Sequence, residues 1–362
     1  MSDPDADVEM EGADDGRGGR RSVVGFDVPV VEAWMRAHTR VEPPCVWQRL
    51  EGGHSNLTFE LTDAVGEQYV IRRPPQGDLL PKAHDMQREF RIIEALFPVG
   101  VPVAEPIGFC DDRTICERHF YVMGKVPGAA LYTAEQTAPR LDASARARVG
   151  PSFIAVLAHL HSIDPDAVGL GDLGRHDGYV ARQLRTWYGS WTASAEAADY
   201  DDDRLHALHD RLVAEIPEQG PARVVHGDYG VHNVMVDDTG TVAAVLDWEI
   251  GTLGDPLADF AYALNAWTEP SDGPNAASTA PTALEGFASR DDLVAAYAAR
   301  TGADLDQLGY YRSFNSFKTA CIVHGVYARY RLGMKSTEGV DMPGLFERMV
   351  TSIELAERHL AG

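Results

Sequence analysis

The alternation of hydrophobic and polar positions predicts a strand-rich lobe early in the chain. An amphipathic run predicts a helix over Val28–Thr39. Apolar residues recur every three or four positions before Pro98, which predicts a second helix over His84–Phe97. Runs rich in β-branched and aromatic residues predict strands at Val46–Leu50, Leu57–Thr62, Gln68–Arg72, Ile107–Cys110 and His119–Met123. Three strands, a helix and a further strand pair describe a small α+β lobe.

Helical patterns dominate after the linker Gly124–Gly128. We predict helices at Ser144–Ser162, Gly178–Trp191, Asp203–Ile216, Pro256–Trp267, Arg290–Arg300, Leu308–Leu332 and Pro343–Leu360. Short strands are expected at Arg223–His226, Val234–Val236 and Val242–Leu246, and loops at Thr192–Asp203 and Glu269–Glu285. The organisation is then a disordered acidic tail over 1–25, an N-terminal lobe over 26–124 and a C-terminal lobe over 125–362.

The charge of the chain limits its partners. Acidic residues outnumber basic ones by 55 to 32, which gives a formal net charge of −23. A chain this acidic repels nucleic acid and anionic membranes unless a local patch reverses the field, so we expect neither as a partner. Only four basic residues are Lys. Abundant Asp with scarce Lys suggests a halophilic protein, although a GC-rich genome also favours Arg over Lys.

Nothing in the sequence predicts secretion or a membrane span. No apolar run reaches the roughly 18 residues of a spanning helix. The segment Met1–Arg21 lacks the apolar stretch of a signal peptide. The four Cys residues show no C-x-x-C spacing and are expected as buried free thiols in a reducing compartment. We therefore expect a cytoplasmic protein.

The densest chemistry lies in His226-Gly-Asp-Tyr-Gly-Val-His-Asn233, followed by Asp247-Trp248-Glu249. Asp228 follows one predicted strand, Asn233 begins the next, and Asp247 ends a third. The predicted hairpin brings these three oxygen-bearing side chains to one end of a small sheet. Hard oxygen ligands suit Mg²⁺, which keeps its waters and shares phosphate oxygens. Two such ligands and one free carboxylate are what phosphoryl transfer to a hydroxyl requires.

The H-G-D-x-x-x-x-N run with the later D-W-E resembles the catalytic and metal loops of the aminoglycoside phosphotransferase-like kinases, relatives of protein kinases. The resemblance implies a bilobal, α+β protein-kinase-like fold with ATP and Mg²⁺ in the cleft. Asp228 would orient the acceptor hydroxyl and accept its proton, and Asn233 and Asp247 would hold Mg²⁺. His226 and Asp259, the latter in a D-P-x-x-D run, would support the catalytic loop.

The same resemblance assigns nucleotide contacts to the N-terminal lobe. The turn Gly52-Gly53-His54-Ser55-Asn56 lies where such kinases cover the phosphates. Arg72 stands where the family has Lys, and Glu89 on the following helix would pair with it. Arg keeps the positive charge and adds a forked donor group. The stretch from Met123 to Val126 would be the hinge whose backbone meets the adenine.

Further runs resemble one branch of the family, the kinase domain found alone in microbes or fused to acyl-CoA dehydrogenases. They include Arg72-Arg-Pro-Pro75, Tyr179-Val-Ala-Arg-Gln183 and the late Phe317-Lys318. The branch implies a 4-hydroxyacyl-CoA thioester as a possible hydroxyl substrate. Candidate substrate contacts are Arg182, Arg185, Trp248, Glu249, Lys318, Tyr327 and Arg331. Tyr327 and Arg331 share a helical face with His324, but aromatic residues at helical spacing are more often core, and Arg on a helix usually reaches solvent.

Other interpretations stay open from the sequence. The acceptor could be an aminoglycoside, a sugar, choline or homoserine. The chain could be a nucleotide-binding pseudokinase, although Asp228, Asn233 and Asp247 are all present. A dinuclear metallohydrolase would use as ligands His226, Asp228, His232 and Asp247, but it leaves the N-terminal features unexplained. The choice of ATP or GTP and the oligomeric state do not follow from the sequence.

Overall fold

The computed structural model describes residues 22–50, 56–75, 85–334 and 337–361. The expected tail therefore lies almost wholly outside the described residues, as does the predicted phosphate loop apart from Asn56. The chain divides into two compact units, residues 1–127 with 244–249 and residues 128–243 with 250–362. The segment Ala244–Glu249, which follows the predicted catalytic loop in sequence, thus packs with the first unit.

The first unit contains a five-stranded antiparallel sheet in the order β3-β4-β5-β7-β6. Its strands are β3 (Val46–Arg49), β4 (Leu57–Thr62), β5 (Gln68–Arg73), β6 (Pro106–Cys110) and β7 (Phe120–Gly124). All five predicted strands are therefore confirmed, with ends that differ by at most one residue. A short pair, β1 (Ser22–Val23) and β2 (Phe26–Asp27), precedes the sheet and was not predicted.

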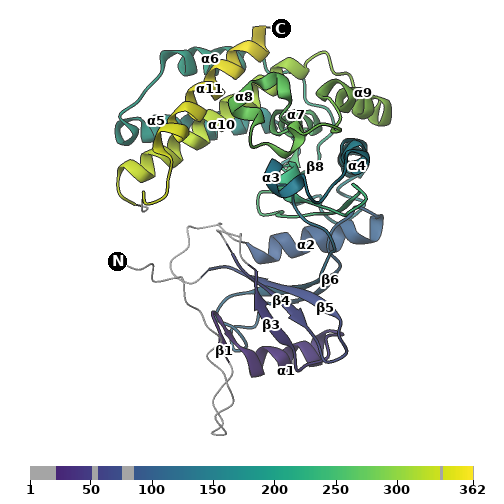
Figure 1. Ribbon diagram of the computed structural model, residues 1–362. Helices are drawn as coiled ribbons and strands as arrows, with labels where there is room; N and C mark the ends of the chain where they lie inside the picture. Colours follow the sequence, from purple (N-terminus) through teal and green to yellow (C-terminus); the bar gives the residue numbers. More distant parts are fainter. Residues whose placement is uncertain (1–21, 51–55, 76–84, 335–336, 362) are drawn as a thin grey trace. The chain divides into compact units, whose positions relative to one another are not determined.

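Two helices cover opposite faces of this sheet (Figure 1). Neighbouring residues of a strand point to opposite faces, so Phe120 and Tyr121 of β7 contact different helices. Phe120 packs edge-on against Trp34 of α1 (Val28–His38), with ring centroids 5.0 Å apart. Tyr121 packs against Phe90 of α2 (Met86–Leu96), with centroids 5.9 Å apart. A single 3-10 turn, η1 (Phe97–Val99), ends α2.

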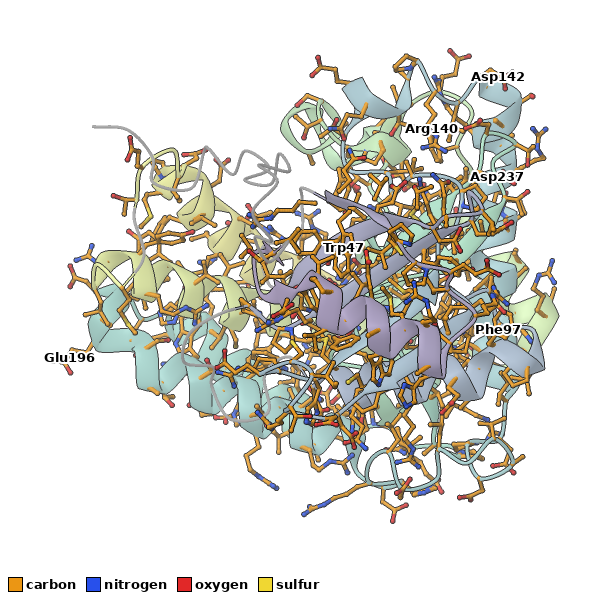
Figure 2. The ribbon with its side chains drawn as sticks, turned by 90° about the horizontal axis from the view of Figure 1, so that it is seen from below. Trp47, Phe97, Arg140, Asp142, Glu196 and Asp237 are labelled. Atoms are coloured by element: carbon orange, nitrogen blue, oxygen red, sulfur yellow. The ribbon has the colours of Figure 1, made fainter. Side chains whose placement is uncertain are left out.

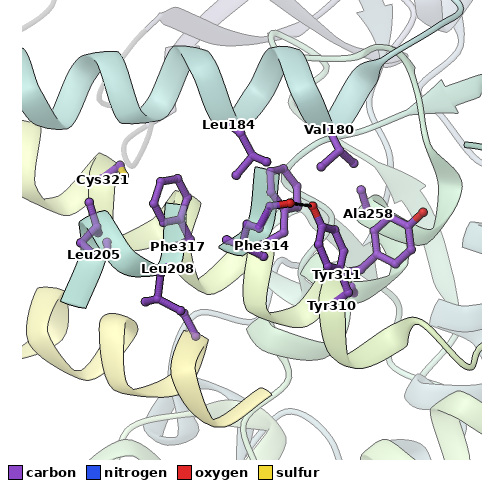
Figure 3. Packing of buried hydrophobic residues seen from close by; sticks show 14 of the residues in the cluster. Val180, Leu184, Leu205, Leu208, Ala258, Tyr310, Tyr311, Phe314, Phe317 and Cys321 are labelled. Carbon is purple, nitrogen blue, oxygen red and sulfur yellow. Dashed lines mark hydrogen bonds between the residues drawn. The ribbon is translucent and has the colours of Figure 1, made fainter. Parts of the chain in front are cut away.

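The second unit is mostly helical and is built around α10 (Leu308–Arg331), which packs against α5, α7 and α11. Figure 3 shows this core: Leu184 of α5 and Leu208 of α6 lie close to Phe314 and Phe317 of α10. The helices are α3 (Ala134–Thr137), α4 (Ala143–Ser162), α5 (Tyr179–Ala198), α6 (Asp203–Ala214), α7 (Pro256–Ala266), α8 (Pro274–Ala277), α9 (Arg290–Thr301), α10 and α11 (Met342–Ala361).

The predicted catalytic region contains four short strands. They are β8 (Arg223–Val225), β9 (Val234–Val236), β10 (Val242–Val245) and β11 (Thr252–Gly254), with the 3-10 turn η2 (Val231–Asn233) before β9. The predicted pairing of β9 with β10 is confirmed. Asp237, which Figure 2 labels, shapes their turn, because its carboxylate accepts the backbone N–H groups of Thr239 and Thr241 at 2.8 and 2.9 Å. The antiparallel partner of β8 is β11, which was not predicted.

Two loop predictions were wrong. α5 continues seven residues past its predicted end, through the Ala-rich stretch Thr192–Ala198. Ala is the best helix former, so this stretch prolongs the helix until Asp199 adopts a left-handed φ of 52°. The predicted loop Glu269–Glu285 contains the short helical turns η3 (Pro270–Asp272), α8 and η4 (Pro281–Ala283), which Pro can begin.

All four thiols are buried and free, as predicted. Within the described ranges, no helix is both long enough and apolar enough to cross a bilayer.

Candidate active site

The loop after β8 is held from below by Asp259 on α7. The carboxylate of Asp259 accepts the backbone N–H groups of His226 and Gly227, each at 2.7 Å, and also contacts Nε2 of His161 at 3.3 Å. Burial by itself would raise the pKa of Asp259, but the contact with His161 and the bonds from the loop lower it. The side chain predicted to support this loop therefore contacts it directly. His226 also contributes, because its Nδ1 accepts the N–H of Asp228 at 3.2 Å.

Asp228 is fixed through both of its carboxylate oxygens. Oδ2 accepts a hydrogen bond from Nδ2 of Asn233 at 2.9 Å, and Oδ1 accepts one from the hydroxyl of Tyr262. Nε2 of His232 lies 3.6 Å from Oδ1. Partial burial opposes ionisation, but the nearby His232 ring and the bond from Tyr262 outweigh it and lower the pKa of Asp228 to about 2. The group is an ionised carboxylate in a fixed orientation.

Tyr262 was missed by the sequence interpretation. It lies on α7 three residues after Asp259, so the two side chains share one face of the helix. That spacing was a usable signal, because a helix that supports the loop through Asp259 also directs Tyr262 toward it. An aromatic residue at helical spacing more often belongs to the core, so Tyr262 was not singled out as a functional residue.

Lys318 of α10 lies beneath the same loop. Its side chain is 6% exposed, its Nζ donates to the carbonyl oxygen of Gly227 at 2.9 Å, and the Tyr262 ring centroid is 5.2 Å away. Burial lowers the pKa of Lys318, against the fields of Asp228 and Asp259. The prediction of Lys318 as a contact for CoA is corrected here, because its ammonium is enclosed and already bonded to the main chain.

In the first unit, Arg72 of β5 connects two carboxylates. One guanidinium nitrogen lies 3.1 Å from Oε2 of Glu89 and another lies 3.1 Å from Oδ1 of Asp247. The predicted ion pair between Arg72 and Glu89 is thus present. Glu89 is 1% exposed and also accepts a hydrogen bond from Tyr121 at 3.0 Å. Burial raises the pKa of Glu89 to about 7, although Arg72 and Tyr121 act in the opposite direction.

Asp247 follows β10 with a left-handed φ of 59°, a conformation that Asp tolerates better than most residues. One carboxylate oxygen from each of Glu89, Asp247 and Glu249 lies within 4.8 Å of the others. Oε1 of Glu89 is buried and has no hydrogen-bond partner among the described residues. Hard oxygens of this kind are the ligands that Mg²⁺ prefers, although two of the three carboxylates, Glu89 and Asp247, already share the guanidinium of Arg72.

The other predicted contacts fall into two groups. Trp248 is 2% exposed and its indole N–H donates to the carbonyl of Val245 at 3.2 Å, so it offers almost no surface to a substrate. His324 is fully buried, bonded to Ser194 at 2.7 Å and stacked on Trp191, which makes it a core residue rather than part of a binding face. The remaining candidates are partly or fully exposed, and they are Met123, Val126, Arg182, Arg185, Glu249, Tyr327 and Arg331.

Comparison with known proteins places these observations in a family. Residues 46–310 match the model of the phosphotransferase enzyme family. Acyl-CoA dehydrogenase family member 11 of Homo sapiens is 32% identical over 322 residues, which cover 86% of this chain and 40% of the human protein. The chain thus spans about two fifths of that relative.

Solved structures agree on the fold. A provisionally assigned aminoglycoside phosphotransferase from Ralstonia eutropha superposes with a TM-score of 0.77 at 29% identity, covering 93% of this chain and 98% of that one. An aminoglycoside phosphotransferase solved with AMP-PNP and hygromycin B has a TM-score of 0.52 at 15% identity, covering 91% and 97%. The kinase-like α+β fold expected from the motifs is confirmed, and the chain belongs to the phosphotransferase enzyme family.

Proposed function

We propose that this chain is an ATP- and Mg²⁺-dependent kinase that phosphorylates a hydroxyl group of a small molecule. The observation that carries the proposal is the orientation of the Asp228 carboxylate. Asn233 and Tyr262 each donate to one of its oxygens, and its pKa is lowered to about 2. Phosphoryl transfer needs such a group to position an alcohol.

In the proposed reaction, Asp228 accepts a hydrogen bond from the alcohol and aims the alcohol oxygen at the γ-phosphorus. The new oxygen–phosphorus bond forms as the bond from that phosphorus to the bridging oxygen of ADP breaks. The alcohol proton passes to Asp228 and then to water. A carboxylate with a pKa of about 2 is a weak base, so its main role is orientation, which suits a loose transition state.

We assign the nucleotide and metal contacts to residues of both motifs. Arg72, oriented by Glu89, would bind the α- and β-phosphates through its forked donors. Asn233 and Asp247 would hold Mg²⁺, which supplies charge neutralisation when bound. The adenine would meet the main chain from Met123 to Val126, and Gly52–Asn56 would cover the phosphates. A structural relative that binds AMP-PNP supports ATP as the donor.

The acceptor we favour is a hydroxyacyl-CoA thioester. The support is the 32% identity to a protein named for acyl-CoA dehydrogenation, which matches the branch resemblance of the sequence. Arg182, Arg185 and Arg331 are cations that reach the surface and suit the phosphates of CoA. The second candidate is an aminoglycoside, which the assignment of the Ralstonia eutropha structure favours.

A coupled assay of ADP release tests the proposal. The panel holds 4-hydroxyacyl-CoAs, aminoglycosides, choline and homoserine, each in ordinary buffer and in molar KCl. We expect release with a hydroxyacyl-CoA and a new phosphate ester in the ³¹P spectrum. Asp228→Asn should still bind Mg-ATP by calorimetry while turnover collapses, and Asp238→Asn, at an exposed turn, should match the wild type. Near-normal turnover of Asp228→Asn would refute the role of this residue, and nucleotide binding without any release would favour a pseudokinase.

A further inference from the structure

We propose that Tyr262 and Lys318 act together as positioning residues that fix Asp228 for transfer. This inference rests on the proposed kinase function. The first observation is that the buried ammonium group of Lys318 has no acidic side chain paired with it among the described residues. Its ammonium is enclosed, and across the described ranges no carboxylate comes within ion-pair distance of it. Burying a charge without a counter-charge is costly, so the Gly227 carbonyl and the Tyr262 ring are the contacts that offset this cost.

The loop backbone shows what this cation holds. The peptides around Gly227 are bound from both sides, because its N–H donates to Asp259 at 2.7 Å and its carbonyl accepts from Lys318 at 2.9 Å. Gly227 has a left-handed φ of 83°, and a Cβ there would lie 3.1 Å from Ile250. Its carbonyl belongs to the peptide bond that leads into Asp228. Lys318 therefore sets the direction in which the main chain enters Asp228.

Tyr262 supplies the second restraint. Its hydroxyl donates to Oδ1 of Asp228, and the ring centroid lies 5.2 Å from Nζ of Lys318. A cation near the face of an aromatic ring is attracted to it and fixes the position of the ring. Lys318 thus acts on Asp228 by two routes, through the Gly227 carbonyl and through Tyr262. Two helices, α7 and α10, hold one carboxylate.

A neighbouring tyrosine provides a matched control. Tyr311, also on α10, is buried and donates to the carboxylate of Asp255 at 2.7 Å. Asp255 caps the start of α7 by accepting the N–H of Leu257 at 3.0 Å. Removing the Tyr311 hydroxyl removes one buried tyrosine–aspartate bond of the same kind, but at the N-cap of α7 and not at Asp228. It tests for a loss of stability without a loss of positioning.

The experiment compares Lys318→Met, Lys318→Arg, Tyr262→Phe and Tyr311→Phe in the full chain. The rates measured are transfer to the best acceptor and the slow hydrolysis of ATP by water, with KM for ATP determined in parallel. We expect kcat to fall about 100-fold for Lys318→Met and about tenfold for Tyr262→Phe, while KM for ATP stays within about twofold. Lys318→Arg should recover part of the loss because it restores a charged donor. Tyr311→Phe should keep the wild-type kcat while lowering the melting temperature.

The outcomes separate this inference from the proposed function. Wild-type kcat in Tyr262→Phe and Lys318→Met, with Asp228→Asn inactive, would overturn the positioning role alone. Normal turnover of Asp228→Asn would instead overturn the proposed function. If Lys318→Met does not fold, Tyr262→Phe and Lys318→Arg decide the question. If the wild type has no measurable activity, crystal structures of the wild type and Tyr262→Phe decide it, since an unmoved Asp228 carboxylate would refute the inference.

Discussion

Replacing Asp259 by Asn should loosen the loop that carries Asp228 by an amount that can be worked out from its contacts. The wild-type carboxylate accepts two loop N–H groups at 2.7 Å in a site that is 3% exposed. Asn offers one oxygen and one NH₂ group, so one loop N–H loses its acceptor and faces another donor. An unsatisfied buried donor costs about 1–3 kcal/mol, and exchanging a charged for a neutral acceptor weakens the bond that remains. We expect a local loss of about 2–4 kcal/mol.

Amide hydrogen exchange followed by mass spectrometry measures this loss at the loop itself. A local opening free energy lower by about 2–4 kcal/mol speeds exchange of the His226 and Gly227 amides by roughly 30- to 1000-fold. The matched control is Asp142→Asn, because Asp142 accepts one N–H at the start of α4 and Asn caps a helix equally well. Unchanged exchange of the two loop amides in Asp259→Asn would refute this account of the loop.

Three further predictions concern the phosphate site, the metal site and the stability of the second unit. Arg72→Met should raise KM for ATP by about tenfold or more while Arg72→Lys raises it less, and equal values would contradict a phosphate contact. Asp247→Ala should weaken Mg-ATP binding in calorimetry, and unchanged affinity would exclude Asp247 as a ligand. Burial lowers the pKa of His324 below its usual 6.5, against the Tyr200 carbonyl and Asp201. The unfolded chain then binds the proton more tightly, so stability is full above pH 6.5 and falls as the pH drops. Urea unfolding at pH 7.5 and 5.5 should show a smaller fall for His324→Gln than for the wild type, and an equal fall would disprove the linkage.

Local sequence patterns predicted those helices and strands that turn one face toward the core and the other toward solvent. β4 and β9 begin and end at the predicted residues, because alternation and β-branched content mark them clearly. β11 (Thr252–Gly254) was not predicted, because three residues are too few to show an alternating pattern. Its pairing with β8 is also a long-range contact. The extension of α5 escaped because small residues such as Ala fit a loop and a helix equally well in a single sequence.

Motif spacing singled out the candidate residues and Asp259 below them, but it gave no signal for two other side chains that hold the loop. Asp228, Asn233 and Asp247 could be singled out because the motif fixes them relative to the strands. The contact between Arg72 and Glu89 was implied by the resemblance to kinases, and helix spacing adds that Glu89 lies at the edge of the inward face of α2. Tyr262 and Lys318 reach Asp228 and Gly227 from 34 and 91 residues away, and no local period relates such positions.

The site beneath the catalytic loop suits a lysine better than the arginine that the chain uses at most other basic positions. Lys318 was a candidate contact for an anionic substrate, yet it binds a main-chain carbonyl, and Lys125 pairs with Glu60 at 2.7 Å. Elsewhere the chain overwhelmingly uses Arg, whose planar fork suits two acceptors in one plane. Beneath the loop there is one carbonyl and one ring face, and a compact ammonium on a flexible stem matches both. The same argument explains why Lys318→Arg should restore only part of the rate, because the larger fork has donors there that the described site cannot satisfy.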